Sequence, residues 1–154
     1  MNVPQFGEPQ PGRSYPDRPA AFVAIERDGM IAVVRVSLPG GGFRVDLPGG
    51  GIDPGEMAEQ AAARECGEEA GLAVEVGAAL GRADHFFVNQ DGETHNTRGR
   101  FFEGRVIAEA PQLKIEPDHA LEWMTPHEAL AALTRPSHAW AMALWLRRDR
   151  RTGR

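Results

Sequence analysis

The chain has 154 residues, of which 42% are hydrophobic and 25% charged, and these values are typical of a single soluble globular domain. Its formal net charge of -5 argues against the broad basic surface of a nucleic-acid-binding protein, and its single cysteine excludes both an intramolecular disulfide framework and a cysteine zinc site. No stretch is long and apolar enough for a signal peptide or a membrane span, so we expect a cytoplasmic protein without a membrane partner.

The first part of the chain is rich in proline. Residues 1–19 contain five of the 12 prolines, a composition that disfavours helices and central strands. We expect an extended arm there, either disordered or laid along a surface. The pattern then predicts one domain in residues 20–146, and residues 147–154 form a basic tail with five arginines. Such a tail is usually solvated, and the acidic total makes nucleic acid an unexpected partner.

Three short strands are predicted at the start of the domain. Residues 20–25 and 30–38 are apolar and β-branched runs. The Asp28-Gly29 pair between them favours a hairpin turn. Residues 43–47 form the third strand, which leads directly into a glycine-rich turn.

A helix is predicted after this turn. Residues 53–56 offer a capping residue, a proline and an acid three positions after the cap, so we expect the helix to start there. Residues 57–70 are rich in alanine and glutamate, which favour helices. Gly71 is a natural stop.

Strands return after the helix, and helices end the chain. The later predicted elements are strands at 72–80, 84–89, 100–108 and 121–124, a helix at 125–133 with its own capping box, and a final helix from Pro136. Strands, one helix, further strands and then helices predict an α/β fold, in which a mixed β-sheet lies between helices.

The predicted central helix carries a cluster of acids. At 100° per residue, Glu65, Glu68 and Glu69 fall within an arc of about 100° on one helix face. Three carboxylates at this spacing repel one another unless a cation compensates, and hard oxygen ligands suit Mg²⁺ or Mn²⁺. The alternative is a solvated glutamate-rich face, which is the common role of such helices.

The glycines before the helix complement these acids. Gly49, Gly50 and Gly51 let the backbone approach a ligand closely, and a helix N-terminus favours negative phosphate. A glycine-rich loop alone is weak evidence for a site. Together with the carboxylates, it predicts a metal–polyphosphate site.

Residues 50–72 read GGIDPGEMAEQAAARECGEEAGL, which fits G-x5-E-x7-R-E-U-x-E-E-x-G-U with U apolar. This pattern resembles the signature box of the Nudix hydrolases at every fixed position, and the order of the surrounding elements also resembles that family. Cys66 occupies an apolar position of the box, so we expect a buried, unreactive thiol there. The resemblance implies a Nudix-type α/β/α sandwich with a mixed β-sheet between helices.

The resemblance also implies roles for the box residues. Glu68 and Glu69 would be direct metal ligands, and Glu65 a further ligand or the base that activates water. The carbonyl of Gly49 would complete the metal site. Arg64 would orient the carboxylates, in a structural pair with Glu56.

The implied reaction is Mg²⁺-dependent attack of water on a diphosphate linkage, in a nucleoside diphosphate linked to another moiety. A nucleoside triphosphate, intact or oxidised, would give the monophosphate and pyrophosphate. Two alternatives stay open: a nucleotide-sensing module that binds without hydrolysis, and an RNA 5′-end pyrophosphohydrolase. Markers of several subfamilies are missing, which leaves a MutT-like domain with an undetermined nucleotide substrate. A homodimer is a further expectation, since dimers are common in the family.

A further acid is expected downstream of the box, as another metal ligand or as the base. From the resemblance, Glu116 is the first choice, because it lies six residues before Glu122-Trp123 and the loop before this strand often carries such an acid in the family. Asp118 and Glu103 are the alternatives.

Substrate contacts are expected from Gly50 and Gly51 and from three basic residues. Arg35, at the end of the second predicted strand, matches a family position that often contacts phosphate; the alternative is an edge-strand arginine in water. His95 and Arg98 lie in the polar segment 89–100, which we expect to be flexible. Its alternative is a solvated hairpin tip.

Overall fold

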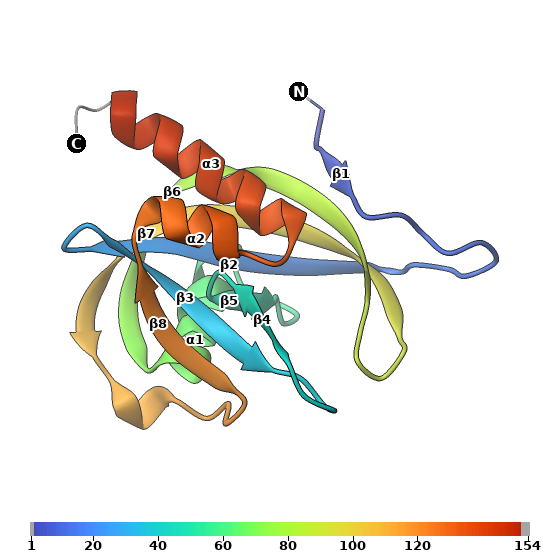
Figure 1. The fold of residues 1–154 in the computed structure, drawn as a ribbon, viewed down its shortest axis with the longest axis horizontal. Coiled ribbons are helices and arrows are strands. Elements are labelled where there is room, and N and C mark those ends of the chain that lie inside the picture. The colour runs from blue at the N-terminus through green and yellow to red at the C-terminus, as the bar shows by residue number, and fades with distance from the viewer. Residues whose placement is uncertain (1, 152–154) are drawn as a thin grey trace.

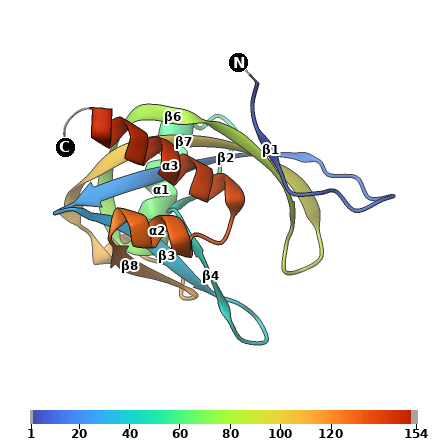
Figure 2. The same cartoon turned by 45° about the horizontal axis from the view of Figure 1, so that its top comes forward.

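A mixed β-sheet lies between helices in the computed structural model, which describes residues 2–151 (Figures 1 and 2). The strands are β1 (Gln5–Phe6), β2 (Asp17–Arg27), β3 (Met30–Ser37), β4 (Phe43–Asp46), β5 (Gly49–Gly51), β6 (Leu72–Val88), β7 (Thr94–Glu109) and β8 (His119–Met124). The helices are α1 (Ala58–Ala70), α2 (Pro126–Ala132) and α3 (Pro136–Arg151), with a 3₁₀ turn at Pro111–Leu113. The predicted α/β fold with a mixed sheet is confirmed.

The strand order is β1-β6-β7-β2-β3-β4, with β5 paired to β2 and β8 paired to β3. Strands β1 and β6 are parallel, as are β2 and β7, while the other pairs are antiparallel. Helix α1 packs on one face of the sheet, and α2 and α3 pack on the other.

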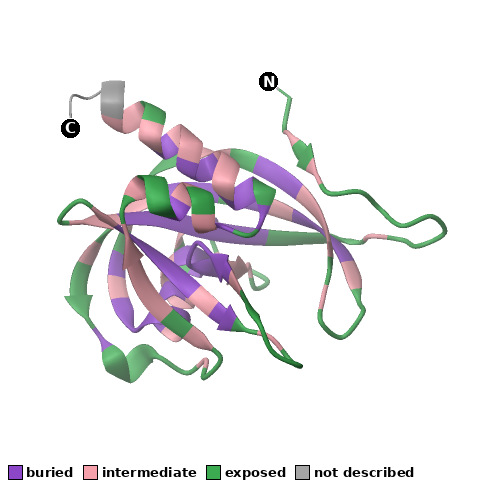
Figure 3. Ribbon diagram, in the orientation of Figure 1, coloured by how far each residue is buried: buried purple, intermediate pink, exposed green. Residues whose placement is uncertain are grey.

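Strand β2 lies at the centre and is buried on both faces (Figure 3). Val23 and Ile25 belong to the core beneath α1, whereas Phe22 and Ala24 belong to the core beneath α2 and α3. Alternate side chains therefore serve opposite layers, which explains why this strand is a continuous apolar run.

The predicted hairpin between β2 and β3 is confirmed. Arg27 pairs with Met30, and the two residues between them, Asp28 and Gly29, have φ of 54° and 79°. Two consecutive positive φ angles are typical of a type I′ turn, whose twist matches the flanking strands.

The helix start predicted at residues 53–56 is wrong. The segment forms a turn closed by a hydrogen bond from Glu56 N to Asp53 O at 3.0 Å, and α1 begins only at Ala58, with Met57 as its N-cap. Gly55 has a φ of 81°, which no α-helix accommodates. The end of the helix is as predicted, because Gly71 adopts the left-handed conformation.

The strands around the predicted flexible segment 89–100 are longer than expected. β6 is one strand instead of two, with register shifts between Val76 and Gly81 that absorb the break in the pattern. β7 begins at Thr94 because it pairs with β6 on one side and with the start of β2 on the other. Long-range pairing therefore orders residues whose local sequence is typical of a loop.

The proline-rich segment is tied to the sheet at both ends. β1 pairs with β6, and Pro16 O accepts a hydrogen bond from Asn96 N at 2.8 Å. β2 starts at Asp17, three residues earlier than predicted.

Helix α3 continues to Arg151 into the predicted basic tail, and residues 152–154 of that tail lie outside the described residues. Within residues 2–151, no helix has both the length and the apolar character to cross a membrane.

Candidate functional site

Helix α1 lies close to the sheet because its inner face is made of small side chains. The buried residues of this face include Ala58, Ala61, Ala62, Cys66 and Ala70. Burial raises the pKa of the Cys66 thiol to about 12, so it stays protonated and unreactive. The close packing fixes the direction of the carboxylates on the neighbouring face of α1.

A cavity of about 270 Å³ opens between α1, the glycine turn and the loop before β8. Its acidic lining residues are Asp46, Glu65, Glu69 and Glu116, and its basic ones are Arg18, Arg44, Arg135 and His119. Gly49 and Gly50 supply backbone to the same wall. Acids and arginines share one concave surface, an arrangement suited to a metal ion and a polyphosphate together.

Glu69 is the most deeply buried of the box carboxylates, with a side chain only 9% exposed. One of its oxygens accepts a hydrogen bond from Gly49 N at 3.1 Å, and the other lies 3.5 Å from His119 Nε2. Burial raises the pKa of Glu69 well above its usual range, and the charges of Glu65 and Glu116 add to this effect. The cluster has a surplus of negative charge that a cation would neutralise.

Glu65 lies against the glycine turn. A Cβ at Gly50 would come within 2.8 Å of the Glu65 carboxyl carbon, so only glycine leaves the carboxylate in this position. Burial raises the pKa of Glu65, an effect that the hydrogen bond from Arg64 opposes. A partly desolvated carboxylate of this kind is a suitable proton acceptor.

Arg64 lies at the centre of an ion-pair network. Its guanidinium donates to Glu56 at 2.8 and 3.0 Å, to Glu65 at 3.1 Å and to Glu68 at 3.2 Å. The hydrogen bond from Arg64 is the main reason that the pKa of Glu56 falls to about 2. The Arg64–Glu56 pair expected from the sequence is therefore present, and it orients both Glu65 and Glu68.

The loop before β8 is joined to α1 by two hydrogen bonds. The backbone nitrogens of Ile115 and Glu116 both donate to the carbonyl of Glu68, at 2.9 and 3.1 Å. These bonds bring Glu116 into the cavity with Glu65 and Glu69.

The same loop carries a group of metal-binding residue types. Ligand atoms of Glu116, Asp118 and His119 lie within 4.8 Å of one another, close enough to share one metal ion. His119 Nε2 links this group to the Glu69 carboxylate.

Comparison with known families identifies the domain. The family model of the NUDIX domain matches residues 16–146, which is most of the chain. The chain belongs to the Nudix hydrolases. A search among curated proteins found no match.

Solved structures of Nudix proteins share this fold. A NUDIX hydrolase from Nitrosomonas europaea superposes with a TM-score of 0.72 at 21% identity, over 84% of this chain and 88% of that one. A MutT protein from Methanosarcina mazei Go1 gives 0.68 at 22% identity, over 93% and 100%. A MutT NUDIX hydrolase from Burkholderia pseudomallei gives 0.59 at 30% identity, over 83% and 97%.

The residues of this Nudix site fit a hard divalent cation. The donors gathered at the cavity are carboxylate oxygens from Glu65, Glu69 and Glu116, which suit Mg²⁺ or Mn²⁺. Because Gly50 has no Cβ, the Glu65 carboxylate can lie beside the backbone of the turn. The metal-ligand roles of Glu65, Glu68, Glu69 and of the Gly49 carbonyl stay predictions.

Three basic residues predicted to bind substrate lie outside the cavity lining. Arg35 pairs with Glu122 at 2.6 Å and lies over the ring of Phe43. His95 is buried in the sheet, and Arg98 is engaged by Asp17 and Asp84. The structure does not bring them together with the box carboxylates.

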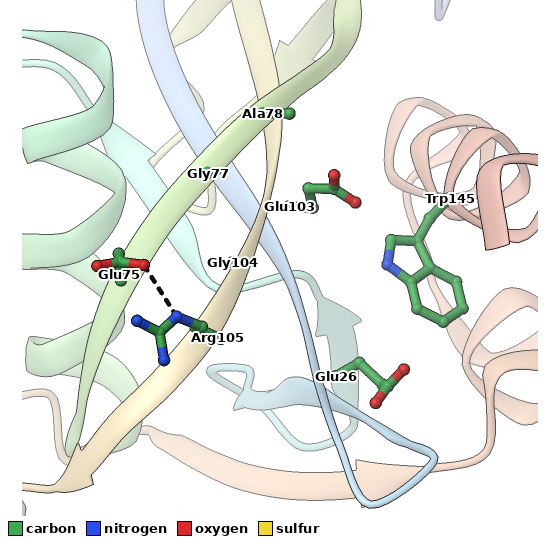
Figure 4. Close-up of a pocket in the computed structure, with 8 residues that line it drawn as sticks. All are labelled: Glu26, Glu75, Gly77, Ala78, Glu103, Gly104, Arg105 and Trp145. Atoms are coloured by element: carbon green, nitrogen blue, oxygen red, sulfur yellow. Dashed lines mark hydrogen bonds and ion pairs between the residues drawn. The ribbon is translucent and has the colours of Figure 1, made fainter. Parts of the chain in front are cut away.

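A second hollow, of about 340 Å³, lies beside α3 (Figure 4). Glu26, Glu103 and Trp145 line it, together with the Glu75–Arg105 ion pair. None of the box carboxylates lines this hollow. Glu103, an alternative for the downstream acid, therefore lies in a different hollow from Glu65 and Glu69.

Five ionisable cavity residues were not predicted from the sequence: Arg18, Arg44, Asp46, His119 and Arg135. One signal was available, because Arg44 and Asp46 are two apart on a strand that leads into the glycine turn and therefore share a face. Arg18 lies in the predicted arm and Arg135 between two helices, where nothing local marks a site. Tertiary packing alone brings these residues together.

Proposed function

We propose that this Nudix protein catalyses the Mg²⁺-dependent hydrolysis of a diphosphate linkage in a nucleoside diphosphate linked to another moiety. A nucleoside triphosphate, intact or oxidised, is one such substrate and would yield the monophosphate and pyrophosphate. The observation that carries the proposal is that Glu65, Glu69 and Glu116 meet the glycine turn in one cavity. A cytoplasmic location and a homodimer remain predictions from the sequence.

The residues of the site have distinct roles in this proposal. Glu65, Glu69 and Glu116 would hold the cation, with Glu68 held beside them by Arg64. A bound Mg²⁺ supplies positive charge to the phosphoryl oxygens and lowers the pKa of water. The partly buried Glu65 carboxylate, or that of Glu116, accepts the proton of the attacking water.

The turn and the arginine contribute by position. A Cβ on Gly49 would meet the backbone of β2 and one on Gly50 would meet the Glu65 carboxylate, so glycine at both positions lets the turn lie close to the sheet and to the carboxylates. Arg64 keeps the Glu65 carboxylate in one orientation. Positioning and charge stabilisation supply most of the catalysis in phosphoryl transfer.

The substrate test is a panel of nucleoside triphosphates, nucleotide sugars, dinucleoside polyphosphates and triphosphorylated RNA, each with Mg²⁺ and with chelator. We expect Mg²⁺-dependent release of phosphate or pyrophosphate from at least one nucleotide. Tight nucleotide binding without release would favour the sensing module. Activity on RNA ends that free nucleotides do not match would favour RNA 5′-end hydrolysis.

The residue test is Glu69→Gln, which removes a buried metal-facing charge while keeping the size of the side chain. We expect kcat to fall by about a hundredfold or more, together with weaker Mn²⁺ binding measured by calorimetry. Glu59→Gln is the matched control, because Glu59 lies on the same helix but outside the cavity. Full activity in Glu69→Gln would overturn the assignment of the metal site.

A further inference from the structure

Three arginines connect the cavity of the box carboxylates to an adjoining hollow, which is distinct from the one beside α3. Arg18, Arg44 and Arg135, together with His119, line both the cavity that holds the carboxylates and an adjoining hollow of about 450 Å³. The Nη2 of Arg18 extends over the glycine turn, since a Cβ on Gly51 would lie 3.0 Å from it. A ligand that reaches from the carboxylates into the hollow must pass these guanidinium groups.

Arg135 is buried without full hydrogen bonding. It is nine-tenths buried, and its guanidinium carbon lies 4.1 Å from the ring centroid of Phe87. Its Nε is 3.6 Å from Asp46 Oδ1, which is close enough for an ion pair but too long for a hydrogen bond. Neither atom has a hydrogen-bond partner within the described residues. A buried donor without a partner on the wall of a cavity indicates a ligand that would satisfy it.

The charge around the arginines is unbalanced. Arg44 and Arg135 share the Asp46 carboxylate: Arg44 donates to it at 2.9 Å and Arg135 lies at 3.6 Å. Arg18 has no ion-pair partner among the side chains of residues 2–149. The adjoining hollow is lined by these three arginines and by two carboxylates, Asp91 and Asp118, so its arginines exceed its acids by one in a protein of net charge -5. A local surplus of this kind in an acidic protein favours an anionic ligand.

We propose that Arg18, Arg44 and Arg135 bind phosphate groups beyond the two of the scissile linkage, so that the site prefers substrates with three or more phosphates in a row. This inference rests on the proposed function. A diphosphate linked to an uncharged moiety has no anionic group beyond the two phosphates of the scissile linkage. A triphosphate supplies further negative charge that can reach the arginines of the hollow, and the planar arginine fork suits phosphate oxygens.

The binding test uses inorganic tripolyphosphate with a chelator, so that neither metal nor hydrolysis contributes. We expect Arg18→Gln to weaken binding, measured by calorimetry, by about tenfold to a hundredfold, because charge-assisted hydrogen bonds are lost. Arg18 is exposed, so this variant leaves the fold intact. Arg82→Gln, an exposed arginine of β6 outside both hollows, is the matched control. Equal binding by Arg18→Gln and Arg82→Gln would overturn the inference.

The selectivity test compares kcat/KM on a nucleoside triphosphate and on a nucleoside diphosphate sugar. In Arg18→Gln and in Arg135→Lys, which keeps the charge beside Asp46 but loses the fork, we expect the ratio of the two values to fall by about tenfold. An equal loss on both substrates contradicts the inference but leaves the proposed function standing. Absence of Mg²⁺-dependent hydrolysis by the wild-type protein contradicts the proposed function, whereas the tripolyphosphate experiment still tests the arginines.

Discussion

Gly50 and Glu65 show how little space separates the backbone from the carboxylates. Gly50 has no positive φ, so an alanine there is compatible with the backbone conformation. Its Cβ would nevertheless lie 2.8 Å from the Glu65 carboxyl carbon, which is the mobile end of a side chain. The steric conflict is therefore relieved by movement of the Glu65 carboxylate instead of by unfolding.

We therefore expect Gly50→Ala to lower kcat by at least about tenfold while the melting temperature changes by only a few degrees. The matched control is Gly77→Ala on β6, where a Cβ meets its nearest atom at 3.4 Å, an ordinary contact. Steady-state kinetics and thermal unfolding of both variants decide the matter. A Gly50→Ala protein with wild-type turnover would mean that the position of Glu65 is not critical.

At the scale of elements, α3 supports the strand that leads into the glycine turn. His138, which is fully buried, accepts a hydrogen bond through Nδ1 from Leu47 N at 3.0 Å. Burial lowers the pKa of His138 to about 3. The imidazole must stay neutral for Nδ1 to accept this bond.

This histidine predicts a loss of stability in acid. In the unfolded chain His138 takes up a proton near pH 6.5, whereas in the folded protein it stays neutral to about pH 3. Between these values the unfolded state binds more protons, so the free energy of unfolding falls as the pH falls, by up to about 1.4 kcal/mol per pH unit from this group.

The measurement is urea unfolding between pH 7 and pH 4, for wild type and for His138→Asn. The asparagine oxygen can still accept from Leu47 N but takes up no proton in this range. We expect a flatter pH dependence in the variant, with the difference confined to pH values below 6.5. Parallel curves for the two proteins would show that His138 does not cause the acid sensitivity.

The elements that the sequence predicts well are those with a strong local signal. The turn at Asp28-Gly29, the apolar run of β2 and the stop at Gly71 are each determined by their own residues. The start of β7 and the continuous β6 were not predictable, because pairing partners distant in sequence stabilise polar segments. For the site, the sequence of the box is enough to place its carboxylates on one helix. The positions of Arg18 and Arg135 in the cavity depend on how the whole sheet folds and could not be predicted.

At the scale of the whole molecule, the N-terminal segment covers an edge of the sheet. β1 pairs with residues 84–85 of β6, and Pro4 O accepts a hydrogen bond from Asp84 N at 2.9 Å. An uncovered strand edge is a template for pairing with another chain.

Deletion of residues 1–11 would uncover this edge. We expect the unfolding free energy to fall by about 1–2 kcal/mol through lost hydrogen bonds, and self-association to increase with concentration. Light scattering and denaturant unfolding measure the two effects. Deletion of residues 1–3, which keeps Pro4, serves as the control. A monomeric, fully stable deletion of residues 1–11 would show that the arm has no role in protecting the edge.

The two hydrogen bonds from Ile115 and Glu116 to the carbonyl of Glu68 have a consequence for how this enzyme can change. They fix the downstream acid to the helix of the box itself, independently of the path that the chain takes between β7 and that point. Pro111 and Gln112 are exposed, whereas Leu113 lies against Gly67 of α1 and Lys114 Nζ donates to the carbonyl of Glu116. We therefore expect changes at residues 111–112 to leave Glu116 in place. Insertions there would alter the surface beside the C-terminal end of α1, in evolution or in the laboratory, without moving the carboxylates of the cavity.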